Sequence, residues 1–463
     1  MNSEERSSES LDVAVLGGSL AGLVAARDLA RRGYRVLVIE ESDAIGGSAA
    51  GLALGDFSVS ARAEGFVDET GALRELGSEL GLGTTTPMSA TTAIRLPGRT
   101  VPMPENTVFG IPGAPLAKDV VDVLGWSGAL RAYGDRLRPV LKIGRYDELG
   151  SLVRGRMGRQ VVDRMLEPVT RAVFGTHVDS LRVADALPEL NGAITRSGSL
   201  SGAISMLRAD LDADDIYTTR DFDGGLHAFV NALVTDAEDY HAIVRLGESV
   251  DLAARDDEGW LLTLNRGAEI RAQAIVVADT ESAAPHRVAL LVPDTALATP
   301  DAPRFSRFFI APAEQKVRCV ELIDATSMWG VGPDGAAVLL LSYRDESQQP
   351  GAAATTGAAL VEQAIADAET LLGIRIGTPM AAAHTGPRVS RPALEPDEGI
   401  HSIGASASLS EVVQRARDAA AAVRRDDFAV PGVSWTERIN ADAAAADGEG
   451  TTDIATMDNK EAP

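Results

Sequence analysis

The stretch from Val13 to Glu41, VAVLGGSLAGLVAARDLARRGYRVLVIEE, restricts the fold of this chain more than any other. A short apolar run, 13–16, is typical of a buried parallel strand and stops at a pair of glycines. Apolar residues then recur at helical spacing from Leu20 to a glycine at position 33, and the run 35–40 (RVLVIE) predicts a second buried strand. A strand, a glycine turn, a helix and a strand within about 30 residues predict a βαβ unit that binds a dinucleotide.

Each position of the glycine turn has a physical role in holding a pyrophosphate. The unpaired N–H groups and the dipole at the start of the helix attract an anion, and Glu40 is placed to accept from a ribose hydroxyl. Ser19 stands where the middle glycine of a GxGxxG fingerprint is expected, and its hydroxyl is a donor for a phosphate. The alternative is a βαβ unit without a ligand. The expected cofactor-binding residues are Gly17, Gly18, Ser19, Leu20, Ala21, Gly22, Glu40 and Glu41.

A second glycine pair, Gly46-Gly47 in ESDAIGG, follows the second strand closely. A plain NAD site does not need such a pair, whereas flavoproteins with two dinucleotide-binding folds use it to pass the chain near FAD. The alternative is an ordinary turn. The place of the pair directly after Glu40 favours FAD as the cofactor.

Three later stretches keep the order of motifs of one known enzyme family. They are 156–190 (RMGRQVVDRMLEPVTRAVFGTHVDSLRVADALPEL), 223–234 (DGGLHAFVNALV) and 244–280 (VRLGESVDLAARDDEGWLLTLNRGAEIRAQAIVVADT). The chain resembles the FAD-dependent protoporphyrinogen and coproporphyrinogen oxidases, especially those of actinobacterial type, within the amine-oxidase and phytoene-desaturase superfamily. The resemblance implies FAD as cofactor, a porphyrinogen of haem biosynthesis as substrate and O2 as acceptor, with Val250 beside the adenine. No residue stands out as a catalytic acid or base.

The order of the segments predicts an α/β fold. We expect a Rossmann-like, two-dinucleotide-binding FAD domain built from separated segments, with an inserted α+β substrate domain. The expected ranges are 11–94, 218–301 and 384–425 for the FAD-binding domain, and 95–217 and 302–383 for the substrate domain. Residues 1–10 and the acidic stretch 426–463 are expected to be disordered tails.

Two positions depart from the family pattern where the chain is expected to pass the flavin ring. In SVSARAEGF, Arg62 takes a glycine position, and in IGASASLSEVV, Ser408 takes another, with Gly404 and Leu409 as the remaining cofactor contacts. A side chain at a position that needs a bare backbone either redirects the chain or blocks the ring. Arg62 is also the candidate for binding the substrate. Two alternatives therefore stay open: a flavin oxidoreductase of the amine-oxidase or desaturase kind with another substrate, and a non-catalytic homologue.

Charge and composition narrow the partners. The formal net charge of −24 argues against nucleic acid, and one cysteine and six scattered histidines predict neither a disulfide framework nor a metal site. The N-terminus lacks the pattern of a signal peptide, so a cytoplasmic location is expected. The segment 131–171 is basic, with ten Lys and Arg against five acids. Substrate propionates, peripheral contact with a membrane and internal ion pairs are the three explanations for it.

Overall fold

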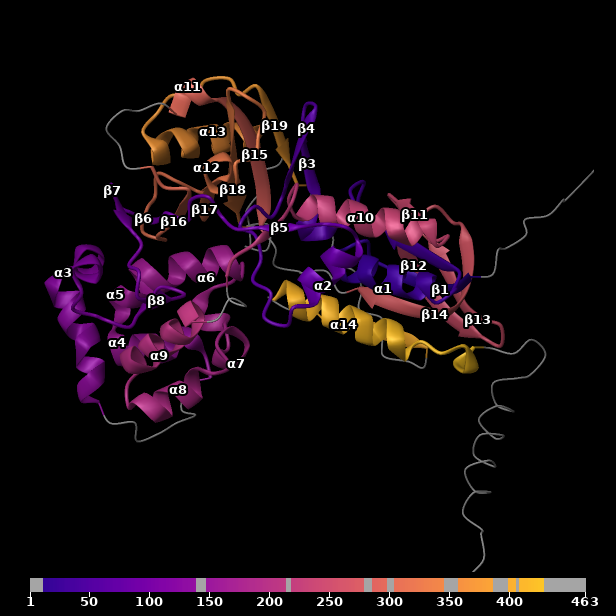
Figure 1. The fold of residues 1–463 in the computed structure, drawn as a ribbon, viewed down its shortest axis with the longest axis horizontal. Helices are drawn as coiled ribbons and strands as arrows, with labels where there is room; N and C mark the ends of the chain where they lie inside the picture. The colour runs from indigo at the N-terminus through magenta and orange to yellow at the C-terminus, as the bar shows by residue number, and fades with distance from the viewer. Residues whose placement is uncertain are drawn as a thin grey trace, which may run out of the picture.

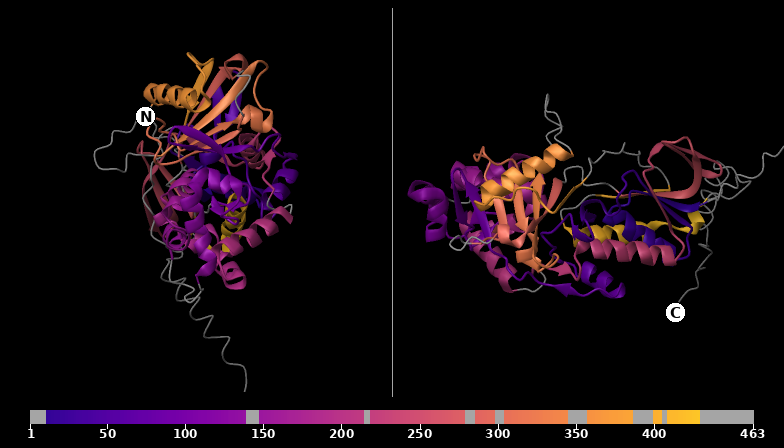
Figure 2. Two further views of the ribbon diagram at one scale, coloured as in Figure 1. Left: turned by 90° about the vertical axis from the view of Figure 1, so that its left-hand side faces the viewer. Right: turned by 90° about the horizontal axis from the view of Figure 1, so that it is seen from above.

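The computed structural model describes residues 11–138, 147–213, 218–278, 285–297, 304–344, 357–385, 399–404 and 408–428. The expected disordered tails, 1–10 and 426–463, lie outside these residues except for 426–428. There the chain forms a short 3-10 turn, Arg425–Asp427, and the ring of Phe428 packs edge-on against Tyr34 with 5.9 Å between the ring centroids. Figure 1 shows one lobe on the right, a second sheet at upper left and a helical region at lower left, and Figure 2 shows the same lobes from two other sides.

The right-hand lobe is built on a seven-stranded sheet in the order β11-β2-β1-β14-β13-β12, with β20 also paired to β14. Strands β11, β2, β1, β14 and β20 run parallel, and the hairpin β12–β13 is antiparallel to them. The strands are β1 (Leu11–Leu16), β2 (Val36–Glu40), β11 (Ile243–Leu246), β12 (Val250–Asp256), β13 (Gly259–Leu264), β14 (Glu269–Ala278) and β20 (Ile400–Ile403). The two strands predicted from the opening stretch are thus neighbours at the centre of this sheet.

Alternating residues of the central strands enter two separate cores, as the pleat of a strand requires. Val13 and Val15 of β1 pack under the helices, whereas Ala14 and Leu16 pack against Trp260 of the β12–β13 hairpin. Because both faces are covered, the strands read as continuous apolar runs rather than as an alternating pattern. This is why the sequence showed them as buried strands.

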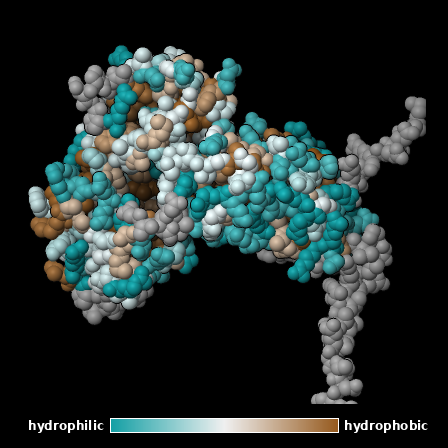
Figure 3. All heavy atoms as spheres, in the orientation of Figure 1, coloured by the Kyte–Doolittle hydropathy of each residue, from teal (hydrophilic) through white to brown (hydrophobic). Residues whose placement is uncertain are grey.

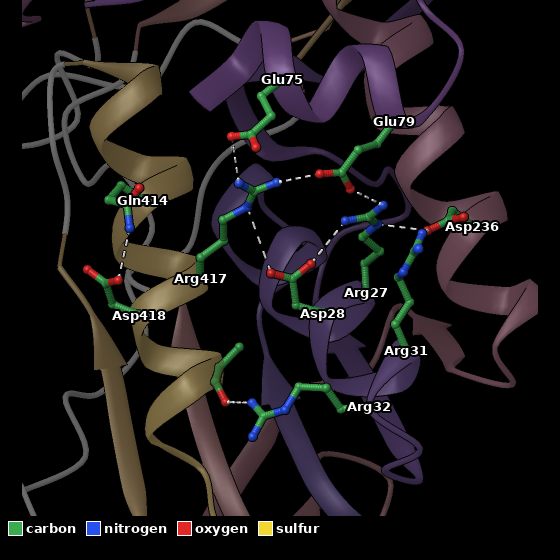
Figure 4. A network of polar contacts seen from close by, with 11 residues as sticks. Arg27, Asp28, Arg31, Arg32, Glu75, Glu79, Asp236, Gln414, Arg417 and Asp418 are labelled. Carbon is green, nitrogen blue, oxygen red and sulfur yellow. Dashed lines mark hydrogen bonds and ion pairs between the residues drawn. The ribbon is translucent and has the colours of Figure 1, made fainter. Parts of the chain in front are cut away.

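Helices α1 (Leu20–Arg31), α10 (Leu226–Asp239), α14 (Leu409–Ala422) and α2 (Ala72–Glu79) cover one face of this sheet. The buried guanidinium of Arg27 links them: it donates to Asp236 of α10 and Glu79 of α2, both at 2.7 Å (Figure 4). Arg417 of α14 reaches Glu79 and Glu75 of α2 at 3.3 Å. One network of ion pairs therefore joins four helices whose sequences lie far apart.

The second sheet has the order β19-β15-β18-β17-β16-β6-β7. One face packs against α13 (Ala358–Leu372), and the other against the hairpin of β3 (Gly51–Leu54) and β4 (Phe57–Ser60) and against α12 (Ala325–Trp329). Its strands are β6 (Thr92–Leu96), β7 (Arg99–Pro102), β15 (His286–Pro293), β16 (Arg307–Ile310), β17 (Glu321–Asp324), β18 (Ala336–Tyr343) and β19 (Ala381–His384), and α11 (Asp294–Leu297) follows β15. The hairpin that follows the glycine pair therefore reaches from the first lobe to the second sheet.

Strand pairing places some segments differently from the expected ranges. β6 (Thr92–Leu96) crosses the expected boundary at residue 94, and β15 (His286–Pro293) falls in the range 218–301 expected for the FAD-binding domain, yet both pair within the second sheet. Apolar strand runs predict burial but not the partner strand, which explains the difference. The assignment of the second sheet and the helical region to a substrate domain remains a prediction.

The helical region comes from the long excursion between the two sheets. It holds α3 (Lys118–Tyr133), α4 (Leu149–Met157), α5 (Arg159–Val161), α6 (Glu167–Val173), α7 (Val183–Ala186), α8 (Leu190–Ser197) and α9 (Leu200–Ala213), with a hairpin of β8 (Thr107–Val108) and β9 (Ile111–Pro112). Val161, Val162, Met165 and Leu166 are buried in the core of this region, whereas Val173 is 38% exposed. One π-helical turn, Val162–Leu166, joins α5 to α6. A further short ladder pairs β5 (Thr84–Thr85) with β10 (Asp221–Phe222).

Candidate functional site

The turn between β1 and α1 can be formed only by glycine at two positions. Gly17 has a φ of +114°, and a Cβ on Gly22 would lie 1.8 Å from the carbonyl oxygen of Gly17. Because that oxygen belongs to the backbone, it cannot move aside cheaply. The sequence prediction that these two glycines make the turn and let the helix start close to it agrees with this geometry.

Ser19 is the N-cap residue of α1, yet its side chain makes no capping hydrogen bond. Its Oγ is buried and has no hydrogen-bond partner among the described residues. The N–H groups of Leu20, Ala21 and Gly22 in the first turn of α1 likewise have no acceptor in the described part of the chain. One hydroxyl and three backbone donors at the positive end of a helix form a cradle for an anion such as a phosphate.

Glu40 ends β2 and lies directly beside this cradle. Its Oε2 accepts a 2.6 Å hydrogen bond from the N–H of Gly18, and its Oε1 accepts from the N–H and the Oγ of Ser42 at 3.0 and 2.8 Å. A carboxylate has about four acceptor positions, so these oxygens are of the kind that accept from a ribose hydroxyl. Glu40 therefore also braces the glycine turn, a second role that sequence reasoning missed. Glu41 follows it and is half-buried.

The second glycine pair lies against the first. The N–H of Gly46 donates to the carbonyl of Gly18 at 2.7 Å, and Ser19 and Gly46 form an isolated parallel bridge. Gly46 and Gly47 have φ values of +102° and +59°, and a Cβ on Gly46 would lie 2.8 Å from Val230 of α10. The structure thus brings together the two motifs that the sequence placed on either side of β2.

The remaining predicted cofactor residues lie farther along the same lobe. Val250 begins β12, half-buried, just after Glu248, whose N–H donates to the carbonyl of Glu40 at 3.1 Å. Gly404 directly follows β20 and is the last described residue before 405–407. Its carbonyl oxygen accepts a hydrogen bond from Arg415 at 3.3 Å. Leu409 is buried at the start of α14. Residues 405–407 lie outside the described residues.

Ser408 is the N-cap residue of α14, and a carboxylate lies against it. Oγ of Ser408 and Oγ of Ser410 each donate to Glu69 at 2.8 Å, and the N–H of Glu411 donates to Ser408 at 3.4 Å. A negative group at a helix N-terminus is favourable. Glu69 was not found by sequence reasoning, because nothing near residue 69 indicates a partner 339 residues away.

Arg62 lies in a group of charged residues between the two lobes. Its Nε is 3.3 Å from Glu64, whose two carboxylate oxygens accept from Arg287 of β15 at 2.8 and 2.9 Å. Glu321 of β17 accepts from Arg307 at 2.7 Å and lies 4.0 Å from Arg287. Three guanidinium groups thus lie close to two carboxylates. We call these five residues the junction cluster.

The pKa values of two carboxyl groups near this cluster move in opposite directions. Burial alone raises the pKa of Glu64, but Arg287 and Arg62 outweigh it and lower that pKa to about 2. Burial raises the pKa of Asp221 to about 7, although the N–H of Phe222 donates to it at 2.9 Å, and the charge of Glu64 adds to the rise. Glu64 is therefore ionised at neutral pH, whereas Asp221 exchanges a proton near it.

His227, in the first turn of α10, forms a pair with Ser60 of β4. Oγ of Ser60 accepts a hydrogen bond from the backbone N–H of His227 at 2.9 Å, and it lies 3.0 Å from Nδ1 of the His227 ring. The hydroxyl proton can therefore be donated to Nδ1, which leaves the ring proton on Nε2. Burial lowers the pKa of His227, so the neutral ring is favoured.

The basic segment 131–171 is largely paired within itself. Arg154, Arg156 and Arg159 form ion pairs with Asp179, Asp135 and Asp163, respectively. Arg131, Arg136, Arg138 and Arg164 instead donate to hydroxyl or carbonyl oxygens. Internal ion pairs thus account for part of the positive charge of the described residues in this segment.

Two further features bear on what the molecule can bind. A pocket of about 370 Å³ lies on the second sheet, lined by residues such as Phe305, Phe308 and Leu371, and shares no residue with the glycine turn. In the described part of the chain, no group of acidic, His and Cys side chains could hold a metal ion, and no helix is long and apolar enough to cross a membrane.

The fold and the glycine turn define a class of flavoprotein, and the chain belongs to the family described as flavin containing amine oxidoreductase, which it matches over residues 20–305. The predicted family resemblance and the α/β fold are thereby confirmed.

Among individual relatives, the chain is 27% identical over 194 residues to a coproporphyrinogen III oxidase of Propionibacterium freudenreichii, which covers 38% of this chain and 34% of the relative. It is 23% identical over 290 residues to the coproporphyrinogen III oxidase of Bacillus subtilis, covering 60% of each. These matches span between about a third and three fifths of the relatives' lengths.

Solved structures show the same fold at low identity. A candidate protoporphyrinogen oxidase from Exiguobacterium sp. 255-15 superimposes with a TM-score of 0.71 at 17% identity, covering 89% of this chain and 98% of that one. A reduced UDP-galactopyranose mutase superimposes with a TM-score of 0.61 at 13% identity, covering 91% and 98%. The fold is therefore shared by a protein named as an oxidase and one named as a mutase, and it does not by itself select a substrate.

Proposed function

We propose that this protein is an FAD-dependent oxidase that converts a porphyrinogen, coproporphyrinogen III or protoporphyrinogen IX, to the porphyrin in haem biosynthesis, with O2 as the acceptor. The observation that carries the cofactor is the cradle of unpartnered donors, Ser19 and the first turn of α1, beside Glu40. Family membership and the relatives that bear the name coproporphyrinogen III oxidase support the chemistry and the substrate class.

The residues present fit the pyrophosphate and ribose half of FAD. Ser19 with the N–H groups of Leu20, Ala21 and Gly22 would hold the pyrophosphate, and Glu40 would accept from the ribose. Bound FAD supplies the redox chemistry, because it takes hydride equivalents from the substrate and passes electrons to O2, which becomes hydrogen peroxide. The glycines of the two motifs allow the chain to approach the cofactor closely.

The junction cluster would act on the substrate. Its five members, Arg62, Glu64, Arg287, Arg307 and Glu321, bring three guanidinium groups together at the second sheet. A porphyrinogen carries several propionate carboxylates, and a guanidinium binds a carboxylate in a planar, two-point fashion. We propose that Arg62 orients the substrate through one propionate, while Glu64 and Arg287 fix the position of Arg62.

One observation favours a second candidate, a homologue that does not use flavin productively. Glu69 accepts hydrogen bonds from the hydroxyl groups of Ser408 and Ser410 at the N-terminus of α14. Helix α14 follows strand β20 in the chain in the same way that α1 follows β1. Both helix N-termini therefore lie at the carboxyl edge of the sheet, where an electron-rich ligand group would be stabilised. At the N-terminus of α14 the carboxylate of Glu69 already occupies this favourable position, so it would compete with such a ligand group.

The absorption spectrum of the purified protein, before and after incubation with FAD and desalting, separates these candidates. We expect a retained flavin band, followed by release of a fluorescent porphyrin when a colourless porphyrinogen and O2 are added. A protein that cannot be loaded with FAD would favour the non-catalytic homologue. A loaded protein that leaves both porphyrinogens unchanged but oxidises an amine would assign it to another branch of the family.

The role of Arg62 has its own test. Arg62→Gly should keep flavin loading and raise KM for the porphyrinogen, and Arg62→Lys should restore part of the loss because it keeps the charge. Higher flavin loading and faster turnover in Arg62→Gly would mean instead that the guanidinium obstructs the cofactor.

We propose a cytoplasmic location for the activity.

A further inference from the structure

A pocket of about 370 Å³ lies on the face of the second sheet that packs against α13. Most of its lining side chains are apolar, such as Phe308 of β16 and Leu371 of α13, and both of these also belong to the core between α13 and the sheet. Its polar lining residues are Thr100, Arg304 and Asp324. A concave apolar site with a few polar groups is the usual form of a small-molecule site. We call it the α13 pocket.

The α13 pocket lies on the opposite face of the second sheet from the junction cluster. Phe308 lines the pocket, whereas Arg307, the residue before it in β16, belongs to the junction cluster, and successive side chains of a strand point to opposite faces. The guanidinium of Arg307 lies over the ring of Phe309 instead, 4.6 Å from its centroid. The pocket is therefore separate from the residues proposed to bind the porphyrinogen.

The walls of the α13 pocket suit an apolar body of modest size. The rings of Phe305 and Phe308 meet edge to face, with 5.8 Å between their centroids. Leu371 and Leu372 come from the last turn of α13. Because ligand sites usually measure about 300–1,000 Å³, this pocket suits a ligand smaller than FAD or a tetrapyrrole. On the side shown in Figure 3, apolar side chains reach the surface of the upper-left lobe in several places, whereas the right-hand lobe is mostly hydrophilic.

Two of the polar lining residues hold hydrogen-bond donors that no described residue uses. Arg304 donates through Nη2 to the carbonyl of Leu297 at 3.0 Å, and it forms no ion pair with a carboxylate in the described part of the chain. Oγ1 of Thr100 accepts from Nη1 of Arg95 at 3.3 Å, which leaves the hydroxyl hydrogen of Thr100 to donate. A guanidinium and a hydroxyl donor in one pocket favour an anionic acceptor.

The third polar lining residue, Asp324, is the N-cap residue of α12. Its Oδ1 accepts from the N–H of Ser327 at 2.9 Å, and its Oδ2 accepts from Oγ of Ser327 at 2.5 Å. Its negative charge would repel a second carboxylate placed beside it. The carboxylate of a ligand is therefore expected at the side of the pocket that Arg304 lines.

We propose that the α13 pocket binds a small monocarboxylate with an apolar body, such as a fatty acid or an aromatic acid. The carboxylate would be held by Arg304 and Thr100, and the body would lie between the edge-to-face rings and α13. A guanidinium binds a carboxylate at two points, and burial of the body removes apolar surface from water. The proposal does not depend on the proposed oxidase activity, because the pocket shares no residue with the glycine turn or the junction cluster.

The test is isothermal titration calorimetry of the full chain, in the presence of excess FAD, with octanoate and with its neutral analogue octanamide. We expect octanoate to bind at one saturable site and about tenfold more tightly than octanamide, because hydrogen bonds to a charged group are the stronger ones. The net charge of the chain is −24, so non-specific adsorption would favour the neutral amide instead. A third ligand, 2-naphthoate, distinguishes the two sources: tighter binding than octanoate would indicate an aromatic acid, and weaker binding a fatty acid.

Arg304→Gln is the decisive variant, since Arg304 is exposed and its replacement should leave the fold intact. It should weaken octanoate binding about tenfold and leave octanamide binding unchanged. Arg304→Lys should restore part of the affinity for octanoate because it keeps the charge. Arg266→Gln, at an exposed arginine after β13 in the other lobe, is the matched control and should change neither affinity.

A second variant tests the wall of the pocket. Leu372→Glu places a carboxylate against the pocket and should abolish octanoate binding, while thermal unfolding checks that the variant is folded. The proposal would be overturned by a wild type without saturable octanoate binding, by equal affinity for octanamide, or by unchanged octanoate affinity in Arg304→Gln. None of these outcomes depends on whether FAD is retained or a porphyrinogen is oxidised, so a failure of the proposed function would be recognised separately.

Discussion

The ion pair between Glu64 and Arg287 should make a large contribution to stability, and Glu64→Gln measures it. The two carboxylate oxygens accept from Arg287 at 2.8 and 2.9 Å, and the side chains are only 15% and 9% exposed. A fall of the pKa from 4.5 to about 2 corresponds to about 3 kcal/mol. Removing one member of a buried ion pair usually costs about 3–5 kcal/mol of stability, because the remaining charge is left buried without a partner. We expect Glu64→Gln to lower the free energy of unfolding by about 3 kcal/mol at neutral pH.

We would measure the free energy of unfolding by urea denaturation followed by circular dichroism, from the first unfolding transition. Because the pKa of Glu64 is lower in the folded protein, its contribution is present above pH 4.5 and is lost as the pH falls towards 2. The difference between wild type and variant should therefore shrink over that window. Glu258→Gln is the control, since Glu258 is 70% exposed and 3.3 Å from Arg271, and it should change stability by less than about 0.5 kcal/mol. A loss below about 1 kcal/mol in Glu64→Gln, or one that does not change with pH, would refute the reasoning.

Three further outcomes are expected. Glu40→Ala should weaken FAD binding by about 1.5–3 kcal/mol, the value of a hydrogen bond to a charged group, and an unchanged dissociation constant in fluorescence titration would remove Glu40 from the site. Ser19→Ala should raise the FAD dissociation constant by about tenfold, while Ser58→Ala on an exposed position of β4 should not. Asp221→Asn should stabilise the protein above pH 7, since a raised pKa makes the stability that Asp221 contributes disappear as the pH rises through about 7. Thermal unfolding at several pH values would show no such gain if folding left the pKa of Asp221 at its ordinary value of 3.8.

Local sequence patterns were sufficient for the first lobe. The strand predicted at 13–16 is β1, and the helix predicted from Leu20 is α1, with Gly33 just beyond its end at a φ of +81°. The periodicity that identifies such elements depends on neighbours within a turn or two, so it is visible in the chain itself. Pairing between strands is not local, so the sequence did not show that β6 and β15 belong to one sheet.

The candidate site, too, has residues that the sequence identified and contacts that only the fold revealed. The glycine turn, Ser19 and Glu40 could be named from one continuous stretch, because a βαβ unit keeps its ligand-binding residues within about 30 positions. The second role of Glu40, as an acceptor for the N–H of Gly18, follows only from the fold. Arg62 was singled out as an odd side chain at a glycine position, but its surroundings were not predictable.

The sequence by itself determined that this chain forms a Rossmann-like flavoprotein fold, since periodicity and glycine spacing act over short ranges. Only the tertiary structure decided which charges meet. Arg287 is 223 residues from Glu64, and Glu69 is 339 residues from Ser408. It also decided that Trp126 and Leu130 of α3 face water, because which face of a helix is buried depends on what packs against it. Residues so far apart carry no mark of each other in the sequence, and the fold alone brings them into contact.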